Sequence, residues 1–399
     1  MNKIEKLINE LCPNDVEFKE LGEVCEIKTW RLNANAMVEK WEYPFFTCAE
    51  KPFKIDNYAF DTEAILISWN WSQVWHVNYY KWKFNAYQRT YVLDNFKDIN
   101  VFFLLHFLKW NLRKYIFEIS KKWSVPYITL PLLKTFKIPL PPLDIQKEIV
   151  KILDNFTKLE AELEAELEAR MKQYEYYRDR LLSFDDDEVE YIKIWDITEF
   201  IKWASIPRDR TSVDFEISYL HYWDIYKLYN NEVDLKQEKN SIIKISSKER
   251  IRDDQFIYSG DIVYNLTSET KEDLWKAVVI NNPDNEKFVA GTETTIMRIL
   301  DKNKLFPKFL NYILMTYWYL KEFKKSITWT KVYRVHPRMI SKIKIPIPSL
   351  EKQKEIVEIL DKFDKLVNDI SEGLPAEIEA RRKQYEYYRG KLLEFEERK

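Results

Sequence analysis

The chain has 399 residues, and its 63 Lys and Arg nearly balance 65 Asp and Glu, giving a formal net charge of −2. This length predicts two to three domains, and a hydrophobic content of 46% is enough to build real cores. No apolar run reaches the roughly 18 residues that a membrane-spanning helix needs, and the first residues show no secretory signal. We therefore expect a cytoplasmic protein that does not engage a membrane.

The first part of the chain predicts an α/β domain over residues 1–142. Short β-rich runs bounded by turn residues lie at 24–28, 43–48, 64–68, 77–80 and 90–93. Residues 99–120 then show apolar residues at helical spacing. The sequence PLPP at 139–142 marks the end of the domain.

A long helix is predicted next, over residues 143–184. Its apolar residues recur in steps of three or four, which places them in one stripe along a helix. Such a helix would be about 60 Å long. A helix of that length with one apolar face needs a partner to cover it.

The same organisation follows a second time. β-like runs at 189–194, 217–221, 242–245, 261–265, 277–280 and 294–299 and a helical run at 306–324 predict a second α/β domain over residues 185–349. The helical block also recurs, because residues 138–184 and 345–395 share the sequences QKEIV and KQYEYYR. The second copy carries four extra residues near Gly373 and Pro375, which should bend or interrupt its helix.

The predicted fold class is therefore α+β. Two tandem α/β domains, 1–142 and 185–349, are separated by a central helix, 143–184, and a C-terminal helical segment, 350–399. We expect the two helical segments to pack as an antiparallel coiled-coil-like pair with pseudo-twofold symmetry. The alternative is two separate helices, each packed on its own domain.

Basic residues gather at equivalent places in the two repeats. Residues 81–140 hold 11 Lys and Arg against 3 Asp and Glu, and residues 301–350 hold 11 against 2. Two electropositive regions suit contact with nucleic acid. The alternative is that these regions are ordinary solvated faces. Because a basic region occurs at the equivalent place in both repeats, the two interpretations have about equal support.

Tryptophan is abundant where glycine would be expected. The chain has 14 Trp and 5 Gly, whereas average usage of about 7% would give roughly 28 glycines. Turns with positive φ accept glycine easily and tryptophan poorly. We hypothesise that many of these tryptophans are glycines in the natural protein, through a UGA codon read as Gly; a genuinely aromatic binding surface is the alternative. The glycine-like positions are Trp69, Trp71, Trp75, Trp82, Trp123, Trp223, Trp275 and Trp329.

These motifs together resemble the specificity (S) subunit of type I restriction–modification systems. The two helical repeats carry IPxP(P/S)L, QKEIV and KQYEYYR, and residues 67–93 resemble one target-recognition pattern of that family. The sequences HYWDIYKLY, GDIVYNLTSET and AGTETTIMRI resemble the other common pattern. The resemblance covers essentially the whole chain and departs from the family at the tryptophans named above.

The resemblance implies a DNA-binding subunit without catalytic activity. Each α/β domain would be a target-recognition domain that reads one half of a split site in double-stranded DNA. The helix pair would set the separation and dock two methyltransferase (M) subunits, with restriction/translocase (R) subunits joining through the complex. S-adenosylmethionine, ATP and Mg would be bound by those partner subunits, and no cofactor by this chain.

Base reading requires polar or basic side chains on loops that reach a groove. For many of the candidates, phosphate contact or simple solvation is the more common outcome. The candidates are Arg31, Asn33, Ser72, Gln73, His76, Asn78 and Arg89 in the first domain and Arg208, Arg210, Thr267, Ser268, Thr270, Lys331, Arg334 and Arg338 in the second.

Other functional classes find less support. The sequence shows no Gly-rich cofactor loop with an Asn/Asp-Pro-Pro-Tyr/Phe motif and no Walker A loop, which counts against a stand-alone methyltransferase. It offers no carboxylate–lysine nuclease site, no catalytic triad, and no His or Cys spacing typical of a metal site. A coiled-coil interaction protein without DNA function remains open, although the paired basic regions count against it. Genes for a methyltransferase and a translocase–nuclease beside this one would discriminate among these classes.

Overall fold

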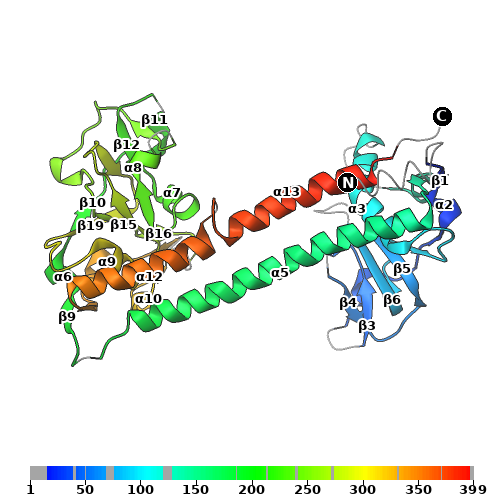
Figure 1. The fold of residues 1–399 in the computed structure, drawn as a ribbon, viewed down its shortest axis with the longest axis horizontal. Helices are drawn as coiled ribbons and strands as arrows, with labels where there is room; N and C mark the ends of the chain where they lie inside the picture. The colour runs from blue at the N-terminus through cyan, green and yellow to red at the C-terminus, as the bar shows by residue number, and fades with distance from the viewer. Residues whose placement is uncertain are drawn as a thin grey trace. The chain divides into compact units, whose positions relative to one another are not determined.

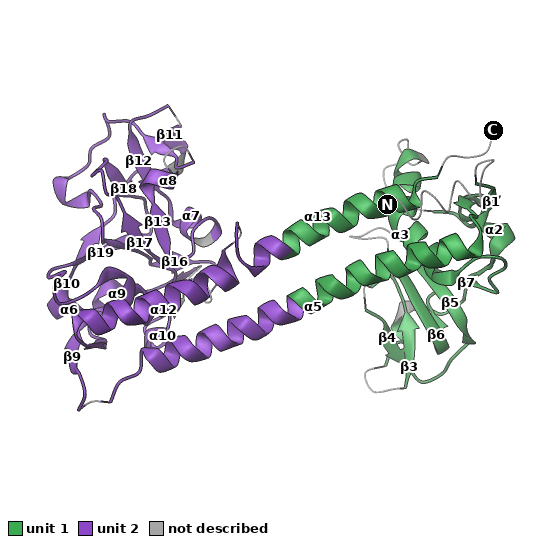
Figure 2. Ribbon diagram, in the orientation of Figure 1, with its two compact units in different colours: residues 1–163, 378–399 green, residues 164–377 purple. Residues whose placement is uncertain are grey.

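A computed structural model describes residues 16–38, 42–49, 51–68, 76–119, 128–185, 187–212, 214–238, 241–270, 274–329, 332–369 and 371–395. The chain divides into two compact units (Figure 2). Unit 1 comprises Met1–Leu163 and Ile378–Lys399, and unit 2 comprises Glu164–Glu377. Each unit therefore contains an α/β region and a section of both long helical segments.

Unit 1 is built on a six-stranded sheet in the order β2-β7-β5-β6-β3-β4 (Figure 1). The strands are β2 (Glu26–Lys28), β3 (Tyr43–Phe46), β4 (Phe53–Ile55), β5 (Phe60–Ser68), β6 (Val77–Ala86) and β7 (Thr90–Asp94). Helix α3 (Val101–Ile119) buries Phe103, Leu104 and Leu108 in one core with Ile65 and Leu93 of the sheet. The predicted helix over 99–120 is confirmed, and its apolar spacing reflects this packing.

The remaining elements of unit 1 join this domain to the long helix. Strand β1 (Phe18–Glu20) pairs antiparallel with β8 (Lys137–Pro139), directly before the long helix. Two short helices, α2 (Leu21–Val24) and α4 (Leu130–Lys134), and the 3₁₀ turn η1 (Ala34–Ala36) complete it. Leu133 and Ile138 are fully buried in the same core as α3, and so are Ile145 and Ile149 of the long helix that follows; the domain and the start of the long helix therefore share one core.

The described part of unit 2 contains three sheets of three to five strands, a two-stranded pair and several short helices. The five-stranded sheet runs β10 (Thr198–Lys202), β19 (Thr294–Ile299), β15 (Ile262–Asn265), β17 (Ala277–Asn281) and β13 (Glu232–Asp234). The four-stranded sheet runs β11 (Thr211–Ser212), β14 (Lys244–Ile245), β12 (Ile217–Leu220) and β18 (Phe288–Ala290). The three-stranded sheet runs β16 (Thr267–Ser268), β21 (Tyr333–Arg334) and β20 (Thr328–Trp329). The short helices are α6 (Ile194–Ile197), α7 (Tyr222–Lys227), α8 (Leu235–Glu238), α9 (Pro307–Ile313), α10 (Tyr317–Lys324) and α11 (Pro337–Ile340), with 3₁₀ turns η3 (Arg208–Arg210) and η4 (Asp253–Gln255).

The two units repeat one strand arrangement. The antiparallel order β2-β7-β5-β6 of unit 1 recurs in unit 2 as β10-β19-β15-β17. The β1–β8 pair likewise recurs as β9 (Glu190–Lys193) with β22 (Lys344–Ile347). The predicted repetition of element order is thus present in the strand pairing itself.

One predicted helix of unit 2 is divided. We expected a single helical run over 306–324, but α9 ends at Ile313 and α10 begins at Tyr317. The buried hydroxyl of Thr316 donates to the Ile313 carbonyl at 2.7 Å. Thr316 is the N-cap of α10 and has an extended backbone with ψ of 149°, so the helical hydrogen bonding is interrupted at this residue.

The long helical segments have the predicted asymmetry. The first is one helix, α5 (Leu143–Leu181), whereas the second is divided into α12 (Leu350–Asn368) and α13 (Leu374–Leu393). At Gly373, an added Cβ would lie 2.6 Å from the Lys365 carbonyl oxygen, so the close turn has no room for a side chain. The predicted interruption near Gly373 and Pro375 is confirmed.

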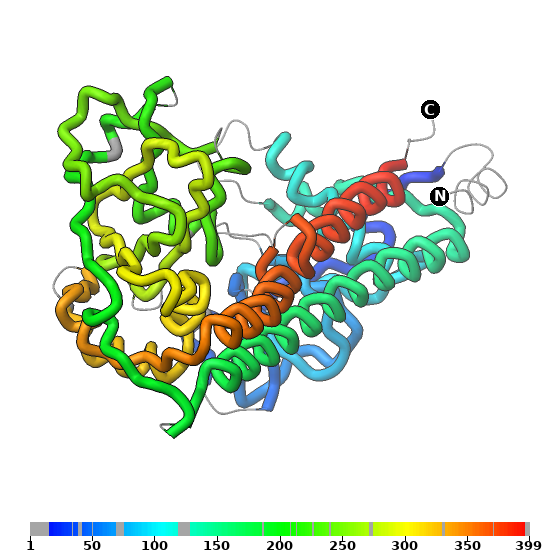
Figure 3. Tube along the Cα trace, turned by 60° about the vertical axis from the view of Figure 1, so that its left-hand side comes forward, coloured from blue at the N-terminus to red at the C-terminus, as the bar shows by residue number. Residues whose placement is uncertain are grey.

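The long helices pack against each other within each unit, and Figures 1 and 3 both show α5 alongside its partner helix. In unit 1, Phe156 of α5 contacts Tyr385 and Tyr388 of α13, with ring centroids 6.0 and 5.6 Å apart. In unit 2, Tyr177 of α5 contacts Phe363 of α12 at 5.8 Å. The predicted helix pair is confirmed, and the alternative of separate helices is wrong.

The directions of the paired helices follow from their contacts. In unit 1, Glu160 lies four residues after Phe156 and accepts from Arg382 Nε at 2.6 Å, so higher numbers on α5 meet lower numbers on α13. In unit 2, the Tyr174 hydroxyl reaches Asp364 at 3.4 Å. Both pairings are antiparallel, as predicted.

Among the glycine-like tryptophans, Trp82 has a backbone conformation that supports the glycine hypothesis. Its φ is 134° and its side chain is 72% exposed, a region of φ that is essentially restricted to glycine. Trp223 lies in the first turn of α7, Trp275 in a turn before β17, and Trp329 at the end of β20. Trp69, Trp71, Trp75 and Trp123 lie outside the described residues.

Candidate nucleic-acid interface

In unit 2, a hollow with basic and aromatic walls brings together three of the predicted candidates. Thr267 of β16 lies directly opposite Arg334 of β21 in an antiparallel ladder. Both side chains line a hollow of about 600 Å³, together with Arg338. The strand pairing therefore gathers residues that are about 70 positions apart in sequence.

A carboxylate joins two of these candidates. Glu293 Oε1 lies 3.3 Å from Arg334 Nη2, and Glu293 Oε2 accepts a hydrogen bond from the Thr267 hydroxyl. The Arg334 side chain remains 55% exposed. The Arg334 guanidinium is thus held by Glu293 at Nη2, while much of the side chain remains accessible to solvent.

Arg338 enters the hollow from a helix start. The backbone N–H of Arg338 donates to Nδ1 of His336 at 3.2 Å, which makes His336 the N-cap of α11. Pro337 occupies the first helical position, where its missing N–H costs nothing. The side chains of His336 and Arg338 are both exposed.

The walls of the hollow combine cations with aromatic surface. Lys202 Nζ lies 5.0 Å above the ring of Trp203, and Trp195 and Phe200 lie on the same hollow. Among the described residues that line the hollow, Lys202, Arg334 and Arg338 are cations and Glu293 is the one carboxylate. This combination can approach a phosphate backbone and also contact base edges.

The other candidates of unit 2 lie elsewhere or are not described. Ser268 is buried, and its Oγ accepts from the Thr270 backbone N–H at 3.2 Å. Arg210 is 3.6 Å from Glu249 and does not line the hollow. The backbone of Arg208 lies in η3, its side chain is outside the description, and Lys331 lies outside the described residues.

In unit 1, two candidate segments lie side by side. Leu32 forms a parallel bridge with Tyr87, and the Gln88 backbone N–H donates to the Leu32 carbonyl at 2.9 Å. These contacts place the segment of Arg31 and Asn33 beside the β6–β7 turn that carries Arg89. All three candidate side chains are exposed.

The remaining candidates of unit 1 lie at the opposite end of β6. Asn78 is opposite Leu66 in the β5–β6 ladder, and the His76 carbonyl accepts from the Ser68 backbone N–H at 3.2 Å. At about 3.4 Å per residue, the length of β6 separates this end from Arg89 by roughly 30 Å. Ser72 and Gln73 lie outside the described residues. The structure therefore divides the unit 1 candidates into two groups.

Residue type and spacing alone did not point to Glu293, Lys202 or the aromatic walls of the hollow. The place of Glu293 beside Thr267 and Arg334 depends on strand pairing between distant segments. The described residues contain no group of three or more His, Cys, Asp and Glu that could hold a metal ion. No helix in the described part of the chain is long and apolar enough to cross a membrane.

The chain is similar in sequence to known type I restriction–modification specificity subunits. The family model for the type I restriction modification DNA specificity domain matches residues 13–172 and 187–380. The chain is 30% identical to a putative type I restriction enzyme specificity subunit of Haemophilus influenzae, over 98% of both chains. It is 34% identical to the EcoR124I/EcoR124II specificity subunit of Escherichia coli, over 65% of this chain and 63% of that one.

Solved structures share the fold. An S subunit of a type I system from M. genitalium matches with a TM-score of 0.53 and 15% identity, over 95% of this chain and 96% of that one. A chain from a study of complex assembly and conformational transition of the type I system matches with a TM-score of 0.64 and 14% identity, over 96% and 98%.

The two matched regions and the paired helices define a DNA specificity protein built from two repeated domains. It belongs to the family of type I restriction–modification DNA specificity subunits, in which catalysis is carried by other subunits of the complex.

Proposed function

We propose that the two α/β regions, residues 1–142 and 185–349, each read one half of a bipartite site in double-stranded DNA. The helical segments 143–184 and 350–399 set the length of the unread spacer between the halves. Two copies of a methyltransferase subunit dock on the chain, and restriction/translocase subunits join through them. S-adenosylmethionine, ATP and Mg act in those partners.

The observation that carries this proposal is the repeated strand order. A site with two halves on neighbouring turns of the major groove calls for two similar reading modules. The recurrence of the order β2-β7-β5-β6 as β10-β19-β15-β17 supports two such modules with a common fold.

The basic surface supports the same proposal. In unit 2, Arg334 and Arg338 line one hollow, and in unit 1 Arg31 and Arg89 lie on adjacent segments. Cations at such places neutralise phosphates, and those that reach a groove also read base edges. We propose that the candidate residues named from the sequence divide between these two roles.

Selection from a random DNA library tests the proposal. The full chain is assembled with the methyltransferase subunit of its own restriction–modification system and incubated with duplexes randomised over about 20 base pairs, roughly two turns of the helix. The selected sequences should show two defined blocks separated by a constant number of undefined base pairs. One uninterrupted block, or no selection at all, would refute it.

A further inference from the structure

The backbone at Glu293 is strained and tightly held. Its φ is 68°, in the left-handed region that residues with a side chain rarely adopt. Such a conformation persists only where the surrounding structure fixes it, and it occurs disproportionately at functional sites.

Neighbouring contacts provide that fixation. A Cβ added at Gly291 would lie 2.1 Å from the Tyr219 hydroxyl oxygen, so the turn presses directly on a fully buried ring. The Leu266 backbone N–H donates to the Glu293 carbonyl at 3.0 Å, and Thr294 Oγ1 donates to the Gly291 carbonyl at 2.8 Å. The direction of the Glu293 side chain is therefore set by a rigid turn.

The carboxylate is occupied on both oxygens. One accepts from the Thr267 hydroxyl, and the other lies 3.3 Å from Arg334 Nη2. A free glutamate on a reading surface would accept from the amino group of cytosine, but here both oxygens already have partners. The group with donors to spare is the arginine, because a guanidinium has five N–H donors.

We propose that Arg334 reads a guanine in the half-site of unit 2 and that Glu293 is its positioning residue. The carboxylate holds one side of the guanidinium, so the other side is presented in a fixed orientation for the N7 and O6 acceptors of guanine. Held in this way, the side chain loses less conformational freedom on binding. This inference rests on the proposed function, since it assigns a base to one of the two reading modules.

The surroundings of Arg334 favour a base edge over a phosphate alone. Phosphate contacts carry no sequence information directly, whereas base reading needs a side chain in a defined orientation, and here a strained turn and a carboxylate orient one arginine. Arg338 and Lys202 on the same hollow are available for the backbone. Arg334 is therefore oriented by a carboxylate, whereas Arg338 and Lys202 have no carboxylate partner among the described contacts.

Library selection with single variants tests the inference. In complexes assembled as above, Arg334→Ala and Arg334→Lys should lose preference for G·C at one position of one half-site by about 5- to 150-fold. The lysine variant keeps the charge but not the bidentate geometry. Glu293→Gln should reduce the same preference by a smaller factor. Every variant should select the other half-site unchanged, which also shows that it is folded and assembled.

A matched control is Arg252→Ala, which removes an exposed arginine that also pairs with a carboxylate, Asp254, at 3.0 Å but does not line the hollow. It should leave all base preferences unchanged. The inference is overturned if the parent protein selects a bipartite site and the Arg334 and Glu293 variants select the same bases. It is also overturned if the affected position prefers a base pair other than G·C. Failure of the parent protein to select two blocks would instead refute the proposed function.

Discussion

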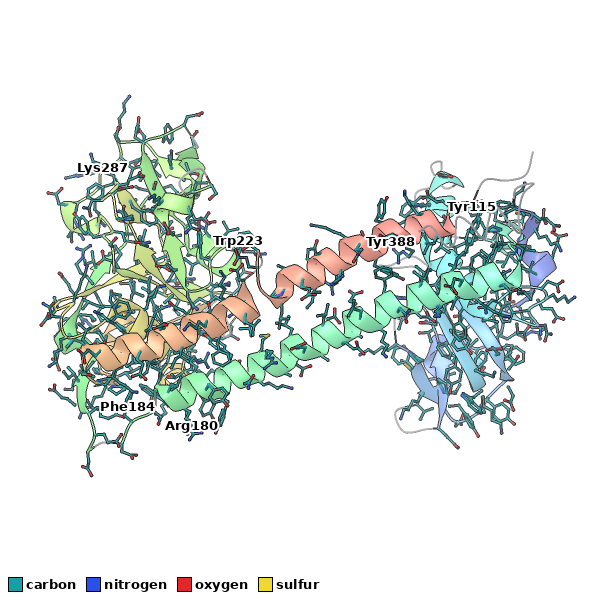
Figure 4. All side chains as sticks on the ribbon, viewed as in Figure 1. Tyr115, Arg180, Phe184, Trp223, Lys287 and Tyr388 are labelled. Carbon is teal, nitrogen blue, oxygen red and sulfur yellow. The ribbon has the colours of Figure 1, made fainter. Side chains whose placement is uncertain are left out.

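Phe156 of α5 stacks on Tyr388 of α13 with ring centroids 5.6 Å apart and 25° between the ring planes. The equivalent residues of the other repeat, Phe363 and Tyr177, meet at 5.8 Å and the same 25°. The two contacts occur in different units and involve the two copies of one sequence repeat. Figure 4 labels Tyr388 on α13. Local equivalence of this kind is what a pseudo-twofold helix pair requires.

The Phe156–Tyr388 contact should contribute measurably to the stability of unit 1. A double-mutant cycle with Phe156→Ala and Tyr388→Ala should give a coupling free energy of about 0.5–1.5 kcal/mol, as aromatic pairs do beyond their burial. Urea unfolding of the full chain, followed by circular dichroism, measures it. The control cycle pairs Phe156→Ala with Tyr387→Ala, because Tyr387 is an exposed neighbour on the same helix. Equal coupling free energies in both cycles would show that the Phe156–Tyr388 contact makes no specific contribution to stability.

A buried glutamine joins each long helix to its own α/β region. Gln146 accepts from the Asn100 backbone N–H and donates to the Pro141 carbonyl, both at 2.7 Å. Gln353 makes the equivalent bonds to Phe306 at 2.8 Å and Pro348 at 2.9 Å. Both side chains are at most 1% exposed, and the repeated sequence QKEIV begins at these residues.

Gln146→Ala and Gln353→Ala should each lower the free energy of unfolding by about 2–4 kcal/mol, because buried backbone groups lose their partners. Thermal unfolding of the purified chain reports the change. Gln173→Ala is the matched control: it removes a partly exposed glutamine that accepts from Arg170 and should cost less than about 0.5 kcal/mol. Similar costs at Gln146 and Gln173 would be incompatible with this role.

Position 82 should prefer glycine. Trp82→Gly relieves a backbone conformation with φ of 134° and should raise the free energy of unfolding by about 1–2 kcal/mol. Lys81→Gly, at an exposed neighbour on the same strand that is not among the residues with positive φ, should instead lower it by about 0.5–1 kcal/mol. A tryptic mass spectrum of the protein from its natural host should show glycine at position 82. Tryptophan there would exclude the codon hypothesis at this site.

His106 gives unit 1 a pH-dependent stability. Burial lowers the pKa of His106 below its ordinary value of 6.5, and the hydrogen bond to Asp154 at 3.0 Å offsets part of that effect. The unfolded chain therefore binds a proton at higher pH than the folded chain. The contribution of the buried, neutral His106 to folding stability is fully present above pH 6.5 and is lost as the pH falls through the lowered pKa.

A comparison of His106→Gln with the parent protein isolates this contribution. The melting temperature of the parent should fall more steeply than that of the variant between pH 6.5 and lower values. Lys109 and Arg389 oppose protonation of His106, and Asp154 favours it. The melting temperature of an Asp154→Asn variant should therefore fall more steeply with decreasing pH than that of the parent. Parallel pH profiles for all three proteins would show that His106 does not titrate between the two states.

Much of the fold was predictable because its determinants are local or repeated. The apolar stripe of residues 143–184, the helix at 99–120 and the interruption near Gly373 each follow from short-range spacing. The division of 306–324 was not predictable in this way, because the break falls at Thr316, where no Gly or Pro marks it in the sequence.

The candidate site was only partly predictable. Residue type pointed to Thr267, Arg334 and Arg338, which the strand pairing does bring to one hollow. It also pointed to Arg210, which is engaged with Glu249 instead. Glu293 could not be found from sequence, since its strained backbone and its contacts to β16 and β21 arise only from long-range pairing.

The central claim is that paired helices fix the spacer between two separately read half-sites. The direct test lengthens both helices by four residues, duplicating 163–166 in α5 and 379–382 in α13, and repeats the library selection. Four residues add about 6 Å and about 40° beyond a full turn, close to the twist of one base pair. We predict unchanged half-sites with a spacer longer by about one or two base pairs. An unchanged spacer, or altered half-site sequences, would contradict the account.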